Sequence, residues 1–487
     1  MPAVVIELDE RADSELQPPA PPKRKDLTTG PITRTLILFA LPTLGSNILQ
    51  SLNGSINAIW VGQILGEAAL AATSNANLIM FLMFALLFGF GMAATILVGQ
   101  HMGRRDIDAM RRVVGTGTGL FLAMSIVIAV LGYLETPTLL HLLATPSEAM
   151  PLAQAYLEVV FLSMPASFVV VQLTMNLRGT GDAMTPLIWM IVSVMLDIAL
   201  NPLLMLGIGP FPTMGIAGSA WASTIAAYVS LVGLLTHIYA KDLLIRLRGA
   251  EWRYLIPDPA ILNVVVAKGF PMALQMVILS ASALIMIGLI NREGVITAAA
   301  YGVTQQLWNY ISMPAMAVGG AVSAMTAQNI GANRWDRVSR ITRAGVIFSL
   351  IVTTSMVVLL ALVDREAIGL FLAQNSPAMP IARHIQLMAT WSFIMFGITF
   401  ILFGTVRANG AVWPPVFILL VSLIPFRLGI AWLMRPMWGA DSIWLSFPIS
   451  SAVTLALAIA YHRWGGWRRA RMIDAPPLQD APLPHAA

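Results

Sequence analysis

Cysteine is absent from this chain of 487 residues, and charged side chains are scarce. Without Cys there can be no disulfide framework, no thiolate chemistry and no Cys-ligated metal. Charged residues make up 11% of the chain, whereas a soluble domain carries about 25%. The six His residues are scattered, and none pairs with another at metal-ligand spacing. The body of the chain is therefore not predicted to be soluble, disordered or nucleic-acid-binding.

Long apolar runs are the main feature of this sequence. Hydrophobic residues make up 57% of the chain, and runs of about 20 of them recur, each able to cross roughly 30 Å of hydrocarbon. Such runs must be helices, because no water in the bilayer core can pair with exposed backbone groups. The sequence therefore predicts an all-α polytopic membrane protein with twelve transmembrane helices. The predicted spans are 36–61, 70–98, 113–134, 152–177, 186–207, 215–239, 261–290, 298–326, 342–363, 382–406, 413–434 and 442–464.

The spans divide into two six-helix lobes, residues 31–240 and 261–465, joined by a polar linker at 241–260. The two ends of the chain, 1–30 and 466–487, are polar and rich in proline. The first end lacks the apolar core of a signal peptide, and we interpret it as a disordered tail. We expect both ends to be cytoplasmic tails.

Lys and Arg indicate the orientation, because they gather in the cytoplasmic loops of membrane proteins. Nearly all of the 29 Lys and Arg lie in the segments on the same side as the N-terminal tail. The exceptions are Arg292, Arg365, Arg383 and Arg435 on the opposite side, and Arg427 within a span. This asymmetry predicts that both termini are cytoplasmic, and it agrees with an even number of spans.

One polar phrase occurs twice, each time between two long apolar runs. Gln-x-x-Gly followed by Asp occurs at 100–108 and again, 228 residues later, at 328–336. A second pair of matching segments, 178–186 and 407–415, is offset by 229 residues. The chain is therefore predicted to contain two copies of one module. Since each copy has six spans, the pseudo-twofold axis should lie along the membrane normal, as in transporters built from parallel repeats.

Ionisable groups within the spans are the first candidates for function, because each costs about 2.5–3.5 kcal/mol to insert. Of the 24 acidic residues, only Glu158 and Asp197 fall inside predicted spans, and Glu158 lies near a span end. Asp197 could bind a proton or a cation. Alternatively, it is a carboxyl that is permanently protonated or neutralised by a neighbouring helix, with no role in transport.

Amides and hydroxyls recur at helical spacing on four spans of the first lobe. They could form one site with Asp197, because oxygen ligands suit protons and hard cations. The alternative is that they join helices by hydrogen bonds, a role that fits Gln172 and Asn176 equally well. The candidate binding residues are Asp197, Asn201, Asn57, Asn53, Gln50, Gln172, Asn176 and Ser223.

The repeated phrase, the Arg-Gly-Thr-Gly-Asp run that opens 178–186, and the twelve spans together resemble the multidrug and toxic compound extrusion (MATE) family, prokaryotic branch. The resemblance covers about residues 33–464 and includes Pro42, which matches a proline at which the first span of the family can bend. It implies an antiporter in the bacterial inner membrane that exports organic, often cationic or lipophilic, compounds. An inward gradient of H⁺ or Na⁺ would drive the export through alternating access.

The polar site departs from the family pattern that the resemblance implies. Relatives commonly carry Asp on span 1, Asn then Asp on span 5, and Thr on span 6. Here these positions are Asn57, Asp197 followed by Asn201, and Ser223. With a single carboxylate, Na⁺ would bind more weakly at Asp197, Asn201, Asn57 and Ser223, so we expect H⁺ coupling.

Two other functions are alternatives to the antiporter. A lipid or lipid-linked oligosaccharide flippase of a related fold would favour several cationic residues around the cavity, and Arg427 is the one candidate visible in the spans. A membrane enzyme would need a clustered catalytic constellation, and none is visible, so the chain is not expected to be an enzyme. We expect no cofactor, resident metal or nucleic-acid partner, and a monomer that meets small organic substrates and membrane lipids.

Overall fold

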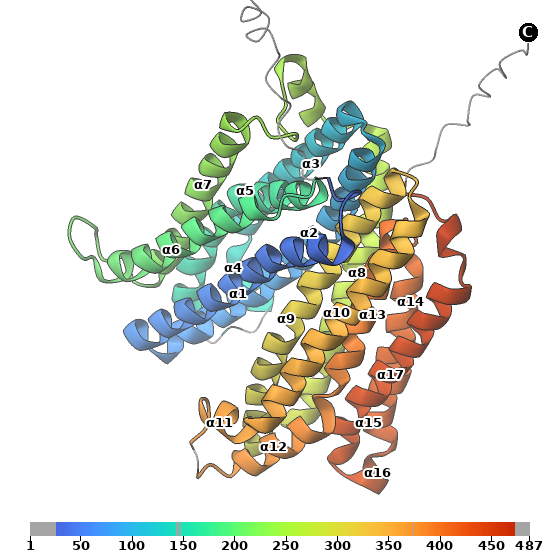
Figure 1. Ribbon diagram of the computed structural model, residues 1–487. Helices are drawn as coiled ribbons and strands as arrows, with labels where there is room; N and C mark the ends of the chain where they lie inside the picture. Colours follow the sequence, from blue (N-terminus) through green and yellow to red (C-terminus); the bar gives the residue numbers. More distant parts are fainter. Residues whose placement is uncertain (1–25, 143–144, 146, 148, 374, 473–487) are drawn as a thin grey trace, which may run out of the picture.

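The computed structural model describes residues 26–142, 145, 147, 149–373 and 375–472 (Figure 1). Its first half contains α1 (Ile32–Leu65), α2 (Glu67–Arg104), α3 (Ile107–Leu134), α4 (Thr136–Leu142), α5 (Met150–Gly179), α6 (Met184–Leu206) and α7 (Ile216–Ala240). The segment between the halves carries η1 (Gly249–Leu255). The second half contains α8 (Pro259–Asn291), α9 (Val295–Gly331), α10 (Trp335–Leu362), α11 (Asp364–Gly369), α12 (Ala378–Ala389), α13 (Ser392–Ala408), α14 (Trp413–Val421), η2 (Ser422–Leu428), α15 (Gly429–Leu433), α16 (Arg435–Trp438), α17 (Asp441–Trp464) and η3 (Gly466–Arg469).

The prediction of twelve spans is confirmed within the part of the chain that the structure describes. Eleven helices are long and apolar enough to cross a membrane, and the pair α12–α13 makes a twelfth. The sequence predicts one straight helix for this span, the tenth in chain order. In the structure the span is broken, and α12 and α13 are bent by 46° relative to each other. The eleventh span changes from α-helix to π-helix at η2, which contains Pro425. Because proline cannot donate a backbone hydrogen bond, it favours such local rearrangement.

Several helices extend beyond the predicted spans, because a transmembrane helix can continue past the hydrocarbon while its backbone bonds are satisfied. The span predicted at 152–177 belongs to α5, which continues to Gly179. The span predicted at 382–406 ends with α13, which continues to Ala408. Each extension brings an arginine, Arg178 or Arg407, into the last helical turn.

The two halves share their apolar cores at one end of the molecule and have separate cores at the other. Leu36 and Phe39 of α1 pack with Val322 of α9, and Ile96 of α2 packs with Met272 of α8. Figure 1 shows the helices of the two halves meeting at this end and diverging away from it. In the diverging region, one core contains only first-half residues and another only second-half residues.

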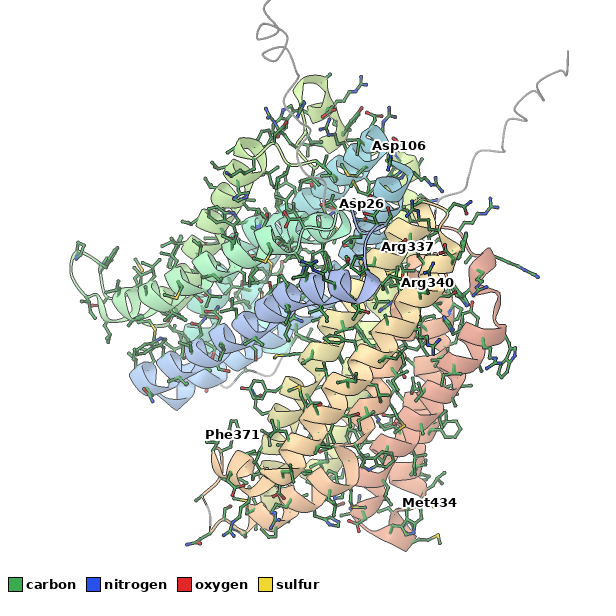
Figure 2. All side chains as sticks on the ribbon, in the orientation of Figure 1. Asp26, Asp106, Arg337, Arg340, Phe371 and Met434 are labelled. Atoms are coloured by element: carbon green, nitrogen blue, oxygen red, sulfur yellow. The ribbon has the colours of Figure 1, made fainter. Side chains whose placement is uncertain are left out.

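We call the end where the halves meet the closed end. Figure 2 places Asp106, Arg337 and Arg340 there, and places Phe371 and Met434 toward the opposite end. The twice-repeated Gln-x-x-Gly phrase also lies at the closed end, since it forms the last turns of α2 and α9. The repeated motif therefore marks the contact between the halves.

The segments assigned to tails and linker are partly built into the fold. The backbone N–H of Leu27 donates to Gln328 Oε1 at 3.2 Å, so the first described residues pack on α9. Trp467 of η3, assigned to the C-terminal tail, is buried, and its indole N–H donates to the carbonyl of His462 at 2.8 Å. The rest of both tails, residues 1–25 and 473–487, lies outside the described part of the chain.

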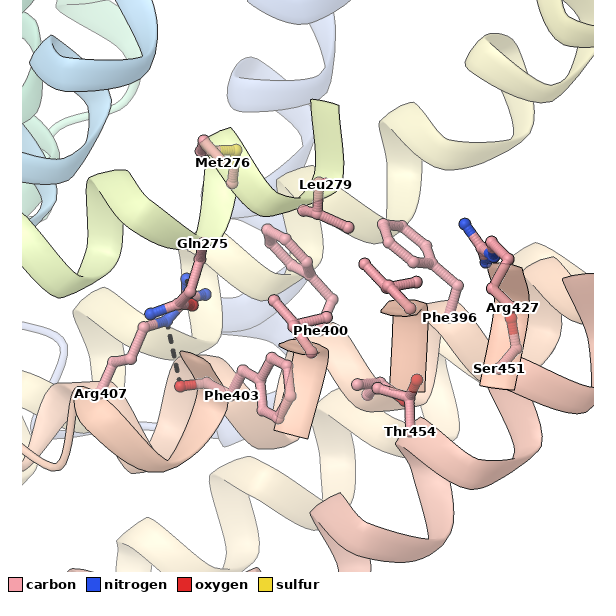
Figure 3. A pocket seen from close by; sticks show the side chains of 13 residues that line it. Gln275, Met276, Leu279, Phe396, Phe400, Phe403, Arg407, Arg427, Ser451 and Thr454 are labelled. Carbon is pink, nitrogen blue, oxygen red and sulfur yellow. Dashed lines mark hydrogen bonds between the residues drawn. The ribbon is translucent and has the colours of Figure 1, made fainter. Parts of the chain in front are cut away.

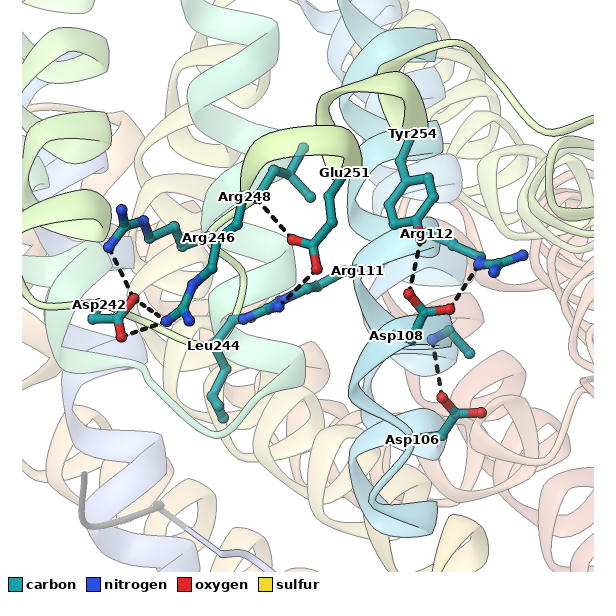
Figure 4. A network of polar contacts seen from close by, with 12 residues as sticks. Asp106, Asp108, Arg111, Arg112, Asp242, Leu244, Arg246, Arg248, Glu251 and Tyr254 are labelled. Carbon is teal, nitrogen blue, oxygen red and sulfur yellow. Dashed lines mark hydrogen bonds and ion pairs between the residues drawn. The ribbon is translucent and has the colours of Figure 1, made fainter. Parts of the chain in front are cut away.

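The predicted linker is held against α3 of the first half (Figure 4). Arg111 on α3 donates to the carbonyl of Leu244 at 3.1 Å and forms an ion pair with Glu251 at 2.9 Å. The Tyr254 hydroxyl donates to Asp108 at 2.8 Å. This segment is therefore packed on the first half, and is more than a loose connection between lobes.

We expect Glu251→Ala to release η1 from α3, because the side chain of Glu251 also accepts from the backbone N–H of Arg248. Tryptic cleavage after Arg246, Arg248 and Arg253 should become several-fold faster, while global stability falls by about 1 kcal/mol or less, as is usual for such ion pairs. Limited proteolysis of the purified protein measures this effect. Glu366→Ala in the second half is the matched control, and equal cleavage rates in both variants would contradict the role assigned to Glu251.

Candidate functional site

The first half contains a cavity of about 450 Å³ between α1, α5, α6 and α7, with part of α2. Pro186 and Asp197, both on α6, line it. They are eleven residues apart, which is roughly 16 Å along the helix axis, so the cavity is elongated. Its polar and charged lining includes Gln50, Asn53, Asn57, Arg178, Asp197 and Ser223.

Asp197 is at the centre of a hydrogen-bond network within this cavity. Its Oδ2 accepts from the amides of Asn53 at 2.8 Å and Asn57 at 2.9 Å, and its Oδ1 accepts from the Ser223 hydroxyl at 2.9 Å. The amide of Asn201 donates to Asn57 Oδ1 at 2.9 Å. Only 2% of Asp197 is exposed. The carboxylate is thus held by three donors from two helices, α1 and α7, which can accommodate its charge without a counter-ion.

Helical spacing explains why these side chains meet. Asn53 and Asn57 are four residues apart on α1, as are Asp197 and Asn201 on α6, so each pair shares one helix face. The α1 pair and the α6 pair then face each other, with Ser223 of α7 closing the group. The amide oxygens of Asn53 and Asn201 are buried without a hydrogen-bond partner. Two hard oxygen ligands therefore lie next to the carboxylate.

Three other predicted residues do not join the network around Asp197. Gln50 lines the same cavity but is exposed and makes no hydrogen bond to the cluster. Gln172 and Asn176 are fully buried, bond weakly to each other at 3.4 Å and do not line the cavity. Gln172 packs against Gly117 of α3, where a Cβ would come within 2.3 Å of its amide nitrogen. The one hydrogen bond of this pair lies within α5, and Gln172 Oε1 and Asn176 Nδ2 are buried without a partner. The pair thus lies outside the network around Asp197, and no hydrogen bond of these side chains joins α5 to another helix in the described part of the chain.

Pro42, the predicted bend position, is buried inside α1, which continues as one helix from Ile32 to Leu65. The Ser46 hydroxyl donates to the Pro42 carbonyl at 3.0 Å. A bend at Pro42 in another state stays a prediction.

The cavity-facing side of α5 is a part of the site that was not predicted from the sequence. The cavity residues on α5 include Tyr156, Ser163, Ser167, Thr174 and Arg178. Their spacing of roughly one or two helical turns was a visible signal, since it places them on one face. The small hydroxyl residues were overlooked because they are common in any transmembrane helix interface.

The second half lacks the counterpart of this acidic network. At the repeat offset of 229 residues, Phe426 corresponds to Asp197 and Ile430 to Asn201. The second half instead has a smaller chamber lined by Arg407 and Arg427 (Figure 3). Among the residues that the structure describes, none that lines that chamber is acidic. The duplicated scaffold thus carries different chemistry in its two halves.

Two repeated six-span modules, the first of which contains a polar intramembrane cavity, define a polytopic membrane protein of the transporter type. The MatE family model matches the chain twice, at residues 42–203 and 271–433, which covers more than half of it. The chain therefore belongs to the MatE family. The two matched segments begin at Pro42 and Pro271, at the offset of the internal repeat.

Individual relatives agree with this assignment. The probable multidrug resistance protein YoeA of Bacillus subtilis is 32% identical over 435 residues, covering 89% of this chain and 94% of that protein. A protein of Shewanella oneidensis named FAD transporter is 25% identical, covering 88% and 94%. A crystal structure of a MATE protein in complex with MaL6 has a TM-score of 0.84 at 17% identity, covering 91% and 98%, and this likeness confirms the fold.

Proposed function

We propose that the chain exports organic, cationic or lipophilic compounds from a bacterial cell by antiport with protons. Asp197 would bind the proton and the substrate in turn, and the two halves would expose the cavity to each side alternately. The observation that carries the proposal is the buried Asp197 carboxylate, held by three donors inside the 450 Å³ cavity. Only a ligand that binds the two states with different affinity can shift the equilibrium between them.

The closed end is proposed to be cytoplasmic, with the protein in the inner membrane. The Lys and Arg asymmetry supports this orientation, since Arg337 and Arg340 lie at the closed end. The cavity would then face outward in the state described here.

Sodium coupling is the second candidate. The unpartnered amide oxygens of Asn53 and Asn201 favour it, because they are hard ligands next to a carboxylate. The presence of a single carboxylate favours the proton, because one charge and neutral amides hold Na⁺ only weakly.

Transport in proteoliposomes under separate gradients decides between the two ions. A pH gradient alone should drive uptake of a cationic dye into inverted vesicles, and a Na⁺ gradient alone should leave uptake at the level of protein-free vesicles. Sodium-driven uptake without a pH gradient would replace the proton proposal. The substrate panel should include a flavin nucleotide beside cationic dyes, because one relative is named a FAD transporter.

The flippase alternative gains support from one observation. Arg178 lines the first-half cavity, and Arg407 and Arg427 line the second-half chamber, whereas the sequence alone indicated Arg427. Scrambling of fluorescent lipids in the same vesicles, without dye transport, would favour the flippase.

A further inference from the structure

The small chamber in the second half is positively charged and contains no acid to balance it. It lies between α8, α13, α14, η2 and α17, and its lining is mostly apolar. Figure 3 shows the rings of Phe396 and Phe400 between Arg407 on one side and Arg427 on the other. No ion pair joins either arginine to another residue in the described part of the chain.

Arg407, which lines this chamber, has an unsatisfied guanidinium nitrogen. Only 1% of the residue is exposed. Its Nε donates to the carbonyl of Phe403 at 3.2 Å and its Nη1 donates to Gln275 Oε1 at 3.3 Å. Its Nη2 is buried with no hydrogen-bond partner. A buried, uncompensated guanidinium is costly, so the free nitrogen indicates that a partner is absent from the protein itself.

Arg427 supplies a second positive charge from an unusual backbone segment. It lies in the π-helix η2, in the eleventh span, and π-helical turns are frequent at functional sites. Its Nε donates to Ser450 at 2.9 Å, and its Cζ lies 4.7 Å from the centre of the Phe447 ring. Neither contact neutralises the charge.

Arg407, in the last turn of α13, occupies a position that the internal repeat duplicates in the first half. Arg178 ends α5 at the equivalent position, lines the first-half cavity, and also has a buried guanidinium nitrogen, Nε, without a partner. In the first half, however, Asp197 lines the same cavity. The second-half chamber therefore favours anions more strongly than the first-half cavity does.

The size of the chamber limits what it can hold. Its free volume is about 50 Å³, and a water-sized group needs about 10–15 Å³ on this scale. The space thus matches the oxygens of one carboxylate or phosphate, with apolar surface from Phe396 and Phe400 beside it. A whole drug-sized molecule would not fit in this state.

We infer that this chamber binds a carboxylate or phosphate group, carried by an amphipathic molecule whose apolar part packs against the phenylalanines. Arg407 binds the oxyanion through its free Nη2, and Arg427 adds positive charge at the other side of the rings. The site is distinct from the coupling site at Asp197 and does not depend on its role.

Thermal unfolding of the protein in phosphatidylcholine nanodiscs tests the site, because a ligand that binds only the folded state raises the Tm. Octyl phosphate should raise the Tm of the wild type, and octylammonium, of equal chain length, should not. In Arg407→Gln, the apparent affinity for octyl phosphate should fall about ten-fold or more, the loss expected for a charge-assisted hydrogen bond. Arg407→Lys should recover part of the lost affinity for octyl phosphate.

Controls separate this site from the coupling site and from general charge effects. Arg292→Gln, at an exposed arginine at the end of α8, should retain wild-type binding of octyl phosphate. Arg407→Gln should lower the affinity in an Asp197→Asn background as much as it does in the wild type. The inference is overturned by equal stabilisation of Arg407→Gln and the wild type, by no stabilisation of the wild type, or by equal stabilisation with octylammonium.

Two further Tm measurements identify the source of the anion. If inorganic phosphate alone raises the Tm in an Arg407-dependent way, the chamber takes free oxyanions. If phosphatidylglycerol in the nanodisc raises the Tm and weakens octyl phosphate binding, the source is a lipid headgroup. The second result supports the inference in full, whereas the first supports the oxyanion site and overturns the amphipathic carrier.

Discussion

Asp197→Asn should reduce gradient-driven efflux to the background of empty vesicles while the protein still folds. The amide has nearly the shape of the carboxylate, but it cannot take up a proton at working pH and carries no charge for a cation. Because Asn53, Asn57 and Ser223 all donate to Asp197, the new amide NH₂ group will also face at least one donor. Dye transport in inverted vesicles under an imposed pH gradient measures the loss.

The matched control is Glu158→Gln on α5, which removes the other acid within a span. Glu158 accepts from Gln154 at 2.8 Å and does not line the cavity, so its efflux should remain within about two-fold of the wild type, as expected for substitutions away from special sites. Binding of a substrate dye to Asp197→Asn, measured without a gradient, separates lost coupling from lost binding. Efflux at the wild-type rate in Asp197→Asn would show that the carboxylate has no coupling role.

Gly103→Ala and Gly331→Ala should each open the closed end of the molecule and stop transport. At Gly103 of α2, a Cβ would lie 1.9 Å from the carbonyl oxygen of Gln328, and at Gly331 of α9, 2.0 Å from that of Gln100. Both neighbours are helix backbone, which cannot move aside as a side chain can. The halves must therefore separate, and the equilibrium should shift toward states that are open at this end.

The same contact is strengthened by the two glutamines of the repeated phrase. Gln100 Nε2 donates to the carbonyl of Ala408 at 2.8 Å, and Gln328 Nε2 donates to that of Gly179 at 2.9 Å. Each bond joins one half to the other, and the two are related by the repeat. Separation of the helices by the alanines would break both bonds.

The lack of native Cys makes the opening measurable by spin labelling. Labels at Arg104→Cys and Arg343→Cys, which are exposed positions in the two halves, should report a longer distance in Gly103→Ala and in Gly331→Ala than in the parent. Gly320→Ala on α9 is the control, because its Cβ meets nothing within 4 Å. An unchanged distance with normal transport would show that the close contact is not needed for the closed state.

Hydrophobic length and charge asymmetry were enough to predict the fold class. Each of the twelve predicted spans corresponds to a helix or to a bent helix pair, because the bilayer forces apolar runs into helices. Helix ends and breaks were harder to predict. The bend between α12 and α13 and the π-helical turn at η2 depend on packing against neighbouring helices, and Pro425 alone did not indicate which irregularity would form.

In the candidate site, too, features set by helical spacing could be predicted, and features set by packing between helices could not. Asn53, Asn57, Asp197 and Asn201 could be grouped from the sequence because helical spacing fixes which side chains share a face. Spacing could not decide which face of α5 points into the cavity. Gln172 of α5 packs against Gly117 of α3, and Arg178 of α5 lines the cavity.

By itself, the sequence determined a duplicated membrane scaffold with one central carboxylate in its first half, since hydropathy, Lys and Arg placement and the repeat are properties of the chain. The tertiary structure decided how the two copies meet. It placed each Gln-x-x-Gly phrase against the other half and brought the arginines of the repeat into separate cavities. The physical reason is that helix rotation and contact between distant helices are set by packing over the whole bundle, which local periodicity does not encode.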